Sequence, residues 1–526
     1  MADEKNHVYI FDTTLRDGEQ ALMRSLTPTQ KLQLAMMLDE LGVDVIEAGF
    51  PISSPGDLKS VHDIGHALKH ATCCGLSRTI EKDIDAVHEA LNGLDHYRIH
   101  TFVATSNIHM KDKLHKDFSQ IIDMCDHCVR YARNYTDDVE FSCEDAGRTP
   151  IDHLCRVVET AINAGATTVN IPDTVGYTLP YEFGNIIKTL FNRVPNIDKA
   201  RISVHCHNDL GMATANSLTA VQEGARQIEV CVNGLGERAG NCSLEEVVMA
   251  MKLRKEYMNG VYTNVVAQNI ARASKMVATV CNEPVPSHKA IVGSNAFAHS
   301  SGIHQDGVLK NKETYEILTP ESVGFKENKL HMTARSGRHM IKAELEKLGY
   351  REGTYNLDDI YQRFLKLADR KGQVFDYDLE ALMYFSQDED EENQFSLDNL
   401  SVLSGGKNVI PTASVRIRIG KRTRTESGTG NGPVDAVFNC INHLTGLKLK
   451  LDSFSINAKG QGMDAQGQVN VDAVCNGRHY YGSGISTDVI EASAMALISA
   501  SNSVYRTELI EKGRKGVEVA DEAGKD

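Results

Sequence analysis

The sequence predicts an α/β protein, with a (β/α)8 TIM barrel followed by a mostly helical connecting region and a C-terminal α+β domain. Three observations predict this fold. Apolar, β-branched segments alternate with helical segments eight times between residues 8 and 254, polar side chains gather where the apolar segments end, and a shorter pattern occurs twice near the C-terminus. Alternating strands and helices form a parallel sheet with right-handed crossovers, and eight such units close into a barrel.

The first strand–helix unit has a clear strand pattern and clear helix start and end signals. Residues 8–14 form the β-branched run VYIFDTT, and residues 27–42 follow with helical spacing. Thr27 and Pro28 are typical of a helix start, and Gly42 is typical of a helix end. The remaining strand segments are 44–50, 72–77, 97–105, 138–145, 167–174, 200–207 and 227–234. The helical segments that follow them are 54–68, 81–93, 118–135, 150–165, 180–194, 212–225 and 243–254.

An open, doubly wound sheet is the alternative architecture for this alternation. Such sheets often carry a GxGxxG turn directly after the first strand, and residues 8–14 are not followed by one. The barrel is therefore favoured, and in a barrel the chemistry lies at the C-terminal ends of the strands.

The composition argues against several classes of function. The 526 residues carry a formal net charge of -15 without long lysine and arginine clusters, which argues against nucleic-acid or anionic-membrane binding. No apolar stretch approaches the ~18 residues of a membrane span, and the acidic start lacks the basic region of a signal peptide. The 12 cysteines are scattered, which suits reduced thiols and a cytoplasmic location. Cys125 and Cys128 form a CxxC pair, but its helical surroundings favour packing.

Polar side chains gather at the predicted strand ends. They are Asp17, Glu47, Arg78, His100, Ser142, Glu144, Asp145, Asp173, Thr174, His205, His207 and Asn241. On a strand, residues i and i+2 point to the same side, so His205 and His207 should project together toward the barrel mouth. Paired imidazoles beside carboxylates make a good site for a divalent metal. The alternative is two histidines that only form hydrogen bonds in a polar barrel end.

Three longer motifs carry a family resemblance. The first strand leads into FDTTLRDGEQ, the seventh strand contains SVHCHNDLG, and NGLGERAGNCSLEE follows the eighth. Together with EFSCEDAGRT, NIPDTVGY, SGIHQDGVLKN and GQVFDYDLEAL, they resemble the 2-isopropylmalate synthase family across nearly the whole chain. The wider family includes homocitrate and citramalate synthases and 3-hydroxy-3-methylglutaryl-CoA lyase, which use a metal on a TIM barrel to make or break a carbon–carbon bond.

The resemblance implies a set of metal ligands. They are Asp17, His205, His207 and Asn241. Spacing alone does not choose Asp17 over Asp12. One carboxylate, two imidazoles and an amide oxygen leave positions of a six-coordinate ion open for the carboxylate and ketone oxygens of a 2-oxo acid. This mixed set suits Mn²⁺, with Mg²⁺ or Zn²⁺ as alternatives, and K⁺ is expected as a further activating ion.

The resemblance also implies catalytic and substrate-binding residues. Arg16 matches the family's catalytic arginine, which stabilises charge on the ketone oxygen and on the enolate of acetyl-CoA. The alternative for Arg16 is an ion pair with Glu47 or Asp145 that only closes the barrel. The residues expected in the oxo-acid pocket are Arg16, His100, Ser142, Glu144 and Thr174. The last four could instead form only a hydrogen-bond network at the barrel mouth. Glu144 and His304, the histidine of GIHQDG, are the candidates for proton transfer.

The reaction implied is the condensation of acetyl-CoA with 3-methyl-2-oxobutanoate, followed by thioester hydrolysis to 2-isopropylmalate and CoA. This is the committed step of leucine biosynthesis. Homocitrate and citramalate synthases are alternatives within the family. A lyase is disfavoured because lyases of this family place a catalytic cysteine in the glycine-rich loop near the eighth strand, where this chain has GLGERAGN. A non-enzymatic amino-acid sensor is disfavoured because every motif residue of the metal site is present.

Three domains are predicted. They are a catalytic barrel, 1–275, a connecting region that completes the active site, 276–392, and a regulatory domain, 393–526. The acidic run DEDEE at 388–392 marks the second boundary, because so many like charges do not pack.

The regulatory domain contains an internal repeat. Residues 413–444 and 467–500 share an order of strand, turn, strand, glycine turn and helix, with glycine turns predicted at 428–432 and 482–484. The resemblance implies that this domain binds leucine, the end product, as an inhibitor. It also implies a homodimer or a tetramer.

Overall fold

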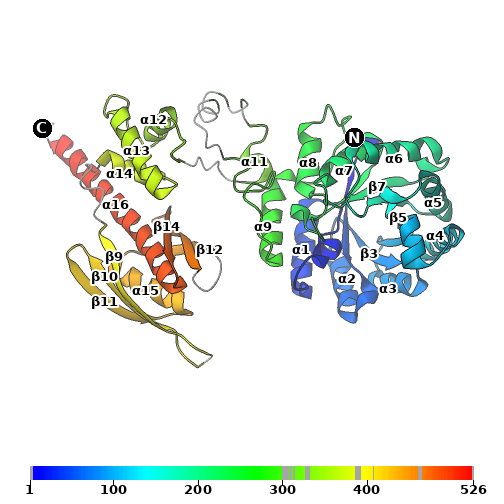
Figure 1. The fold of residues 1–526 in the computed structure, drawn as a ribbon, viewed down its shortest axis with the longest axis horizontal. Coiled ribbons are helices and arrows are strands. Elements are labelled where there is room, and N and C mark those ends of the chain that lie inside the picture. The colour runs from blue at the N-terminus through cyan, green and yellow to red at the C-terminus, as the bar shows by residue number, and fades with distance from the viewer. Residues whose placement is uncertain are drawn as a thin grey trace. The chain divides into compact units, whose positions relative to one another are not determined.

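The computed structural model describes residues 4–298, 316–325, 332–384, 393–406, 408–459 and 465–523, with the single positions 307, 311 and 314. The chain divides into two compact units (Figure 1). The first comprises Met1–Ala298 and Glu316–Lys329, and the second comprises His299–Tyr315 and Leu330–Asp526. Within the described ranges, none of the helices combines the length and the apolar character needed to cross a membrane.

The first unit contains a closed barrel of eight parallel strands, as predicted (Figure 1). Consecutive strands pair with one another, and β1 closes the barrel by pairing with β8. The strands are β1 (Tyr9–Asp12), β2 (Val45–Gly49), β3 (Thr72–Arg78), β4 (Arg98–Ala104), β5 (Asp138–Glu144), β6 (Thr168–Asp173), β7 (Arg201–Cys206) and β8 (Gln227–Val230). Each predicted strand segment overlaps one of them, so the predicted strand order is confirmed.

A helix follows each strand and covers the outside of the barrel. The helices are α1 (Pro28–Leu41), α2 (Pro55–Ala67), α3 (Glu81–Leu91), α4 (Phe118–Ala132), α5 (Ile151–Ala164), α6 (Pro180–Arg193), α7 (Ala213–Gln222) and α8 (Leu244–Leu253). In α1, the Thr27 side chain accepts the backbone N–H of Gln30, and Gly42 ends the helix with a φ of 88°. A further helix, α9 (Ile270–Cys281), packs against α1.

The barrel interior is polar near the N-terminal ends of the strands. Arg98 donates hydrogen bonds of 2.8 Å to Glu140 and to Gln227. Because β4 and β8 are not neighbours, the contact between Arg98 and Gln227 crosses the interior. The apolar core lies instead between strands and helices, where Leu38 and Ile46 are fully buried. The interior is thus filled by fixed side chains, and these support the residues at its upper end.

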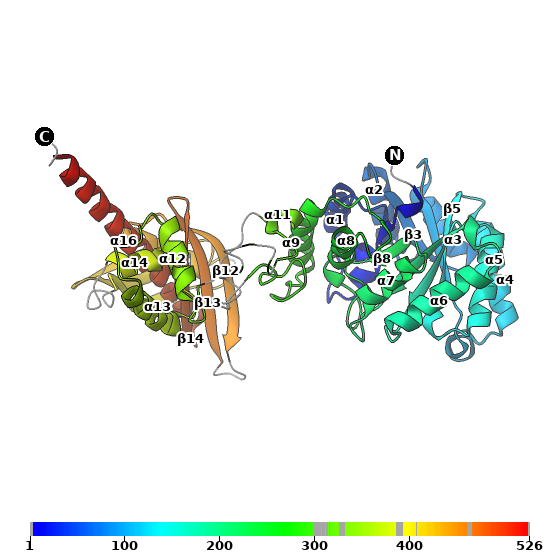
Figure 2. The ribbon, with the colours of Figure 1, turned by 90° about the horizontal axis from the view of Figure 1, so that it is seen from above.

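From residue 332 on, the described part of the second unit starts with helices, as predicted for the connecting region (Figure 2). These are α12 (Arg338–Lys347), α13 (Leu357–Lys371) and α14 (Asp376–Tyr384). They share a small core that includes Met340, Phe364 and Leu379. The short α11 (Pro320–Val323) belongs to the first unit.

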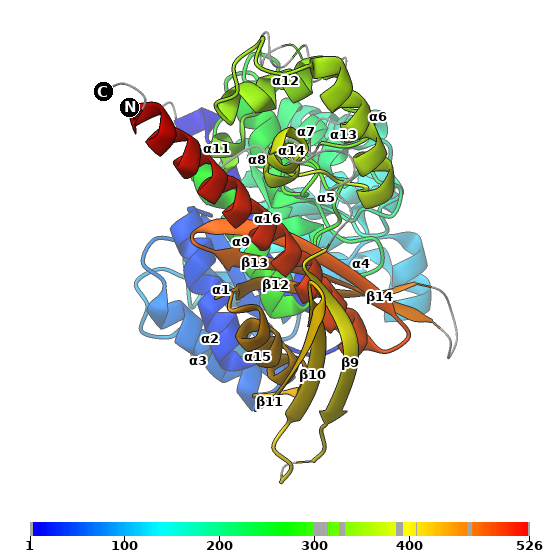
Figure 3. The ribbon, with the colours of Figure 1, turned by 90° about the vertical axis from the view of Figure 1, so that its left-hand side faces the viewer.

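Two antiparallel three-stranded sheets and two helices complete the second unit (Figure 3). The first sheet has the order β11-β10-β9, and the second has the order β12-β13-β14. Their strands are β9 (Phe395–Leu403), β10 (Thr412–Ile419), β11 (Arg422–Thr429), β12 (Lys450–Lys459), β13 (Gln466–Cys475) and β14 (Arg478–Ser486). Helix α15 (Pro433–Thr445) packs on β10 and β11, and α16 (Val489–Ala523) packs on β13 and β14. The predicted internal repeat is therefore present.

The prediction for this repeat was wrong in two details. Each half has an additional strand, β9 or β12, which is the outermost strand of its sheet and leaves many side chains exposed, so its apolar pattern is weak. Gly482 and Gly484 lie inside β14 rather than in a turn. A Cβ atom at Gly482 would lie 2.0 Å from the Ala496 carbonyl oxygen, so glycine is needed for α16 to approach the strand.

Candidate active site

A tight turn after β1 places Asp17 at the barrel mouth. Residues Thr14–Gly18 form a single π-helical turn, and the Thr13 hydroxyl accepts the backbone N–H of Asp17 at 3.3 Å. The buried Asp12 carboxylate accepts the backbone N–H and the hydroxyl of Thr14, at 2.9 and 3.1 Å. Asp12 therefore holds the turn, and Asp17 is the aspartate that faces the ends of β7 and β8.

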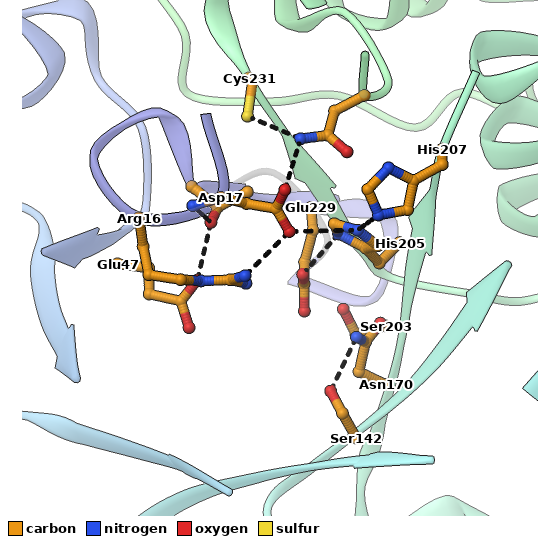
Figure 4. A network of polar contacts seen from close by, with 12 residues as sticks. Arg16, Asp17, Glu47, Ser142, Asn170, Ser203, His205, His207, Glu229 and Cys231 are labelled. Carbon is orange, nitrogen blue, oxygen red and sulfur yellow. Dashed lines mark hydrogen bonds and ion pairs between the residues drawn. The ribbon is translucent and has the colours of Figure 1, made fainter. Parts of the chain in front are cut away.

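Asp17, His205 and His207 converge at this end of the barrel (Figure 4). The Nε2 atoms of the two histidines are 3.2 Å apart, and Nε2 of His205 lies 3.7 Å from Asp17 Oδ2. All three side chains are buried. The two imidazoles thus point to the same side of the chain, as the spacing of two residues at the end of a strand predicts.

Asn241 completes the group with an amide oxygen. Its Nδ2 atom donates to the backbone oxygen of Leu235 at 3.1 Å, and it also lies 3.3 Å from Cys231 Sγ and 3.2 Å from Asp17 Oδ1. Because a carbonyl oxygen only accepts, the contact with Leu235 fixes which end of the amide is nitrogen. The Oδ1 atom is then buried without a hydrogen-bond partner.

The electrostatics of these side chains suit a cation. Burial raises the pKa of Asp17, but the neighbouring Arg16 guanidinium, followed by His205, outweighs it, so the pKa lies well below its usual range. Burial and the neighbouring His205 lower the pKa of His207 to about 3. At neutral pH, Asp17 is therefore a carboxylate and His207 is neutral. An anionic oxygen, imidazole nitrogens and the partnerless Asn241 oxygen fit a divalent cation.

Arg16 is held in place by two carboxylates. Its Nη1 atom lies 2.8 Å from Asp17 Oδ2, and its Nε atom lies 2.7 Å from Glu47 Oε2. Burial lowers the pKa of Arg16, but the charges of Glu47 and Asp17 outweigh it and raise the pKa above its usual value. The pairing with Glu47 that the sequence allowed is thus present, whereas Asp145 pairs with Arg148 instead, at 2.8 Å. The guanidinium is fixed beside the candidate metal ligands.

His100 and Ser142 belong to a hydrogen-bonded chain that begins at Glu47. The Nδ1 atom of His100 lies 2.7 Å from Glu47 Oε1, and its Nε2 atom lies 2.7 Å from the Ser142 hydroxyl. Asn170 donates to the same hydroxyl at 2.9 Å. These buried contacts show that the network allowed by the sequence exists, and they join Arg16 to the opposite side of the mouth.

Glu144 and Thr174 are engaged elsewhere. The Glu144 carboxylate pairs with Lys113 Nζ at 2.6 Å, and the Thr174 hydroxyl accepts the backbone N–H of Asp145 at 2.9 Å. Neither side chain has a contact with the Arg16 and Asp17 group in the described structure. His304 lies outside the described residues, so its role stays a prediction.

A second group with the residue types of a metal site is Glu47, Cys74 and His100. Both carboxylate oxygens of Glu47 already accept hydrogen bonds or pair with Arg16, and His100 uses both ring nitrogens. Burial raises the pKa of Cys74 well above its usual value, so this thiol is protonated. This group therefore fits a metal less well than the group around Asp17.

Two buried residues of the site were missed in the sequence. Glu229 on β8 lies 2.8 Å from His205 Nδ1, and Asn170 on β6 binds Ser142. Each is the single strongly polar residue of a short apolar stretch, IEV or VNI. A polar residue at an inward position of a buried strand was the available signal, although such residues more often serve packing networks.

Three family models match successive parts of the chain. They are HMGL-like over residues 7–277, homocitrate synthase post-HMGL domain-like over 291–372, and LeuA allosteric (dimerisation) domain over 373–505. A 2-isopropylmalate synthase of Campylobacter jejuni subsp. jejuni is 65% identical over 507 residues, which cover 96% of this chain and 99% of the relative. The chain belongs to the 2-isopropylmalate synthase family. The family resemblance carried by the motifs is confirmed.

Other members of the 2-isopropylmalate synthase family agree along their whole length. The synthase of Tolumonas auensis is 60% identical over 501 residues, covering 95% of this chain and 96% of the relative. The synthase of Aliivibrio fischeri is 59% identical over 510 residues, covering 97% of this chain and 98% of the relative. A solved hydroxymethylglutaryl-CoA lyase from Pseudomonas aeruginosa is 20% identical with a TM-score of 0.47, covering 54% of this chain and 96% of that chain. The predicted enzyme class, an acyltransferase, is confirmed by the full-length relatives.

Acid should weaken the fold of this synthase through Glu47. Burial raises the pKa of Glu47, but the positive charges of Arg16 and His100 outweigh it and lower the pKa from 4.5 to about 2. A carboxyl group with a lower pKa in the folded state stabilises the fold above its unfolded pKa, and this contribution is lost as the pH falls through the folded pKa. Between pH 4.5 and about 2, the wild-type chain should therefore lose stability through this group.

Glu47→Gln should remove that part of the acid sensitivity. Urea unfolding followed by circular dichroism, at about pH 6 and about pH 3, gives the free energy of unfolding for both chains. The wild-type chain should lose more stability between the two conditions than the Glu47→Gln chain. Equal losses would show that Glu47 does not titrate in this way.

Proposed function

We propose that the upper end of the barrel binds a divalent cation and joins acetyl-CoA to 3-methyl-2-oxobutanoate, yielding 2-isopropylmalate and CoA after thioester hydrolysis. The observation that carries this proposal is the buried donor set at one point of the mouth. The proposed donors are Asp17 Oδ2 and the Nε2 atoms of His205 and His207, which converge, and Asn241 Oδ1, which is buried without a hydrogen-bond partner. Mn²⁺ suits this mixture of oxygen and nitrogen donors, with Mg²⁺ and Zn²⁺ as alternatives. The cation supplies Lewis-acid polarisation of a ketone oxygen.

Arg16 is proposed to stabilise the oxygen that becomes negative when the new carbon–carbon bond forms. Its Nε and Nη1 atoms bind Glu47 and Asp17, and its Nη2 atom takes part in neither contact. The Nη2 group is therefore oriented by the other two and can donate to a substrate oxygen beside the donor set. A guanidinium fixed before the reaction needs no reorganisation as the charge develops.

Proton transfer is proposed for Glu144 and His304. A base must take a proton from the methyl group of acetyl-CoA, and a water molecule must attack the thioester. Glu144 lies at the mouth and is held by Lys113, whose side chain is half-exposed. Glu144 therefore accepts a proton when Lys113 turns toward solvent. His100, Ser142 and Thr174 are proposed to shape the oxo-acid pocket, with His100 fixed by both of its ring nitrogens.

The choice of oxo acid tests the proposed function. The full-length chain is mixed with Mn²⁺, acetyl-CoA and one of three oxo acids, and the released CoA thiol is measured with a thiol reagent. Thiol release should be fastest with 3-methyl-2-oxobutanoate, and mass spectrometry should identify 2-isopropylmalate. Faster release with 2-oxoglutarate or pyruvate would point to homocitrate or citramalate synthesis. No thiol release with any oxo acid would contradict the condensation.

Regulation by leucine is proposed for the C-terminal domain. The proposed division of the chain is a catalytic barrel, 1–275, a connecting region, 276–392, and this regulatory domain, 393–526. The match of 373–505 to a LeuA allosteric (dimerisation) domain supports both leucine control and assembly of two copies of the chain. Within the second unit, Arg478 on β14 lies 2.9 Å from Asp376 and 2.8 Å from Glu380, both on α14. This double ion pair ties the sheet of the C-terminal domain to the connecting helices, so it can transmit a change in that domain.

Leucine inhibition should depend on this connection. Arg478→Gln should keep leucine binding, measured by calorimetry on the full-length chain, but should weaken inhibition of thiol release by about 5–150-fold in the leucine concentration required. Arg416→Gln is the matched control, because Arg416 is an exposed arginine on β10 whose nearest carboxylate, Asp398, is 3.8 Å away. Unchanged inhibition in Arg478→Gln would show that the signal takes another route.

A further inference from the structure

His205 and His207 differ in what lies behind their rings. The Nδ1 atom of His205 lies 2.8 Å from Glu229 Oε2, and the Glu229 side chain is 1% exposed (Figure 4). The Nδ1 atom of His207 has no hydrogen-bond partner among the described residues. The two candidate ligands therefore have similar burial and nearly touch through their Nε2 atoms, but only one of them is supported from behind.

We propose that Glu229 is a positioning residue that fixes His205 as the anchoring ligand of the metal site, and that His207 is the more loosely held ligand. This inference rests on the metal site proposed above. It adds a residue that never touches the cation but sets how strongly the site holds it.

The reason lies in the two forms of a neutral imidazole. The Nε2 atom has a free lone pair for a metal only when the proton is on Nδ1. A buried Nδ1–H group needs an acceptor, and a carboxylate can only accept. Glu229 therefore favours the form of His205 that binds metal through Nε2. A carboxylate behind a metal-binding histidine fixes the ring and raises its basicity.

Strand pairing makes this contact a rigid one. His205 and Glu229 are register partners on the neighbouring strands β7 and β8, so their backbones are held side by side. The Oε2 atom lies off the direction in which the Nδ1–H bond points, because the 2.8 Å contact does not meet hydrogen-bond geometry. A cation held by Nε2 would limit rotation of the ring, and the ring would have to turn for its Nδ1–H group to point at the carboxylate.

His207 has a different backbone setting. It follows the end of β7, where its backbone forms an isolated bridge with Asn241 and its N–H donates to the Asp173 carbonyl at 3.3 Å. No described residue accepts a proton from its Nδ1 atom, so nothing behind the ring favours the form that leaves Nε2 free for a metal. Its bond to a cation should therefore contribute less to affinity than the bond from His205.

The test measures Mn²⁺ affinity of the full-length chain from the electron paramagnetic resonance signal of free Mn²⁺, without substrates. Glu229→Gln should raise the Kd about 10–100-fold, because the amide can donate to Nδ1 and so place the proton on Nε2. Glu229→Asp keeps the charge and should recover part of the affinity. His205→Ala should raise the Kd more than His207→Ala does.

Glu140→Gln is the matched control. Glu140 is a second fully buried glutamate inside the barrel, but it binds Arg98 and Gln227 and has no contact with the metal ligands. It should keep the wild-type Kd. The role of Glu229 would be overturned if Glu229→Gln kept the wild-type Mn²⁺ affinity, or if Glu140→Gln lost as much affinity as Glu229→Gln. The ranking of the two histidines would be overturned if His207→Ala lost more Mn²⁺ affinity than His205→Ala. A wild-type chain without Mn²⁺ affinity would instead refute the proposed metal site.

Discussion

The Asp17→Asn chain should lose Mn²⁺ binding and release CoA thiol at least about 10³-fold more slowly than the wild type, because Lewis-acid stabilisation is worth several kcal/mol. Asp17 is the only anionic member of the proposed donor set, and Asn keeps its shape while removing the charge. The barrel should still fold, since the turn is held by Thr13 and Asp12 rather than by the Asp17 carboxylate. Mn²⁺ binding and thiol release are measured on the same preparation.

Asp12→Asn is the control that separates the two aspartates of the first motif. The Asp12 carboxylate accepts the backbone N–H and the hydroxyl of Thr14 and does not belong to the group that Asp17 forms with the two histidines. Burial raises the pKa of Asp12 to about 7, although the hydrogen bonds from Thr14 lower it in part. Its replacement should therefore change the stability of the turn more than the affinity for Mn²⁺. An Asp17→Asn chain that binds Mn²⁺ as the wild type does, or an Asp12→Asn chain that alone loses it, would reverse the assignment.

Arg16→Lys should lower kcat about 10²–10³-fold, the usual effect of removing one preorganised donor to a developing oxyanion. A lysine has no planar fork, so it cannot bind Asp17 and Glu47 while presenting a third donor to the substrate. The KM for the oxo acid should rise much less, because the interaction strengthens only as charge develops. Steady-state thiol release at several oxo-acid concentrations gives both constants.

Arg148→Lys is the matched control for Arg16. Arg148 also lies at the barrel mouth and pairs with a buried carboxylate, that of Asp145, but it has no contact with the proposed ligands. Its kcat should stay near the wild-type value. If Arg16→Lys keeps kcat and changes only stability, Arg16 has the purely structural role that the sequence left open.

The strand periodicity predicted the paired histidines of the site. Two residues of separation at the end of a buried strand place both side chains on one side, and His205 and His207 lie there in the structure. The barrel itself followed from the eightfold alternation of segments, which is a signal carried by many residues. Such distributed patterns survive local irregularities, so fold class was predictable from the sequence.

Other parts of the site depend on contacts that spacing does not contain. The choice between Asp12 and Asp17 is made by a π-helical turn that rotates one carboxylate inward and the other toward Thr14. The support of His205 by Glu229 requires the register of β7 against β8, two strands that are joined through a helix. The free oxygen of Asn241 is set by the backbone carbonyl of Leu235. None of these is visible in a linear pattern.

The C-terminal domain shows a second limit. Strands β9 and β12 are edge strands with many exposed side chains, so their sequences lack the strict alternation of a strand covered on one face. Gly482 and Gly484 resemble turn residues in sequence, but their role is to let α16 pack closely on β14. A glycine that serves close packing and one that serves a turn look alike until the partner helix is known.

Anomalous diffraction from crystals of the full-length chain grown with Mn²⁺ locates the bound cation. We expect one Mn²⁺ peak within bonding distance of Asp17 Oδ2, the Nε2 atoms of His205 and His207, and Asn241 Oδ1, with other positions open for a 2-oxo acid. A peak between Glu47, Cys74 and His100, or no peak inside the barrel at an Mn²⁺ concentration that supports thiol release, would contradict it.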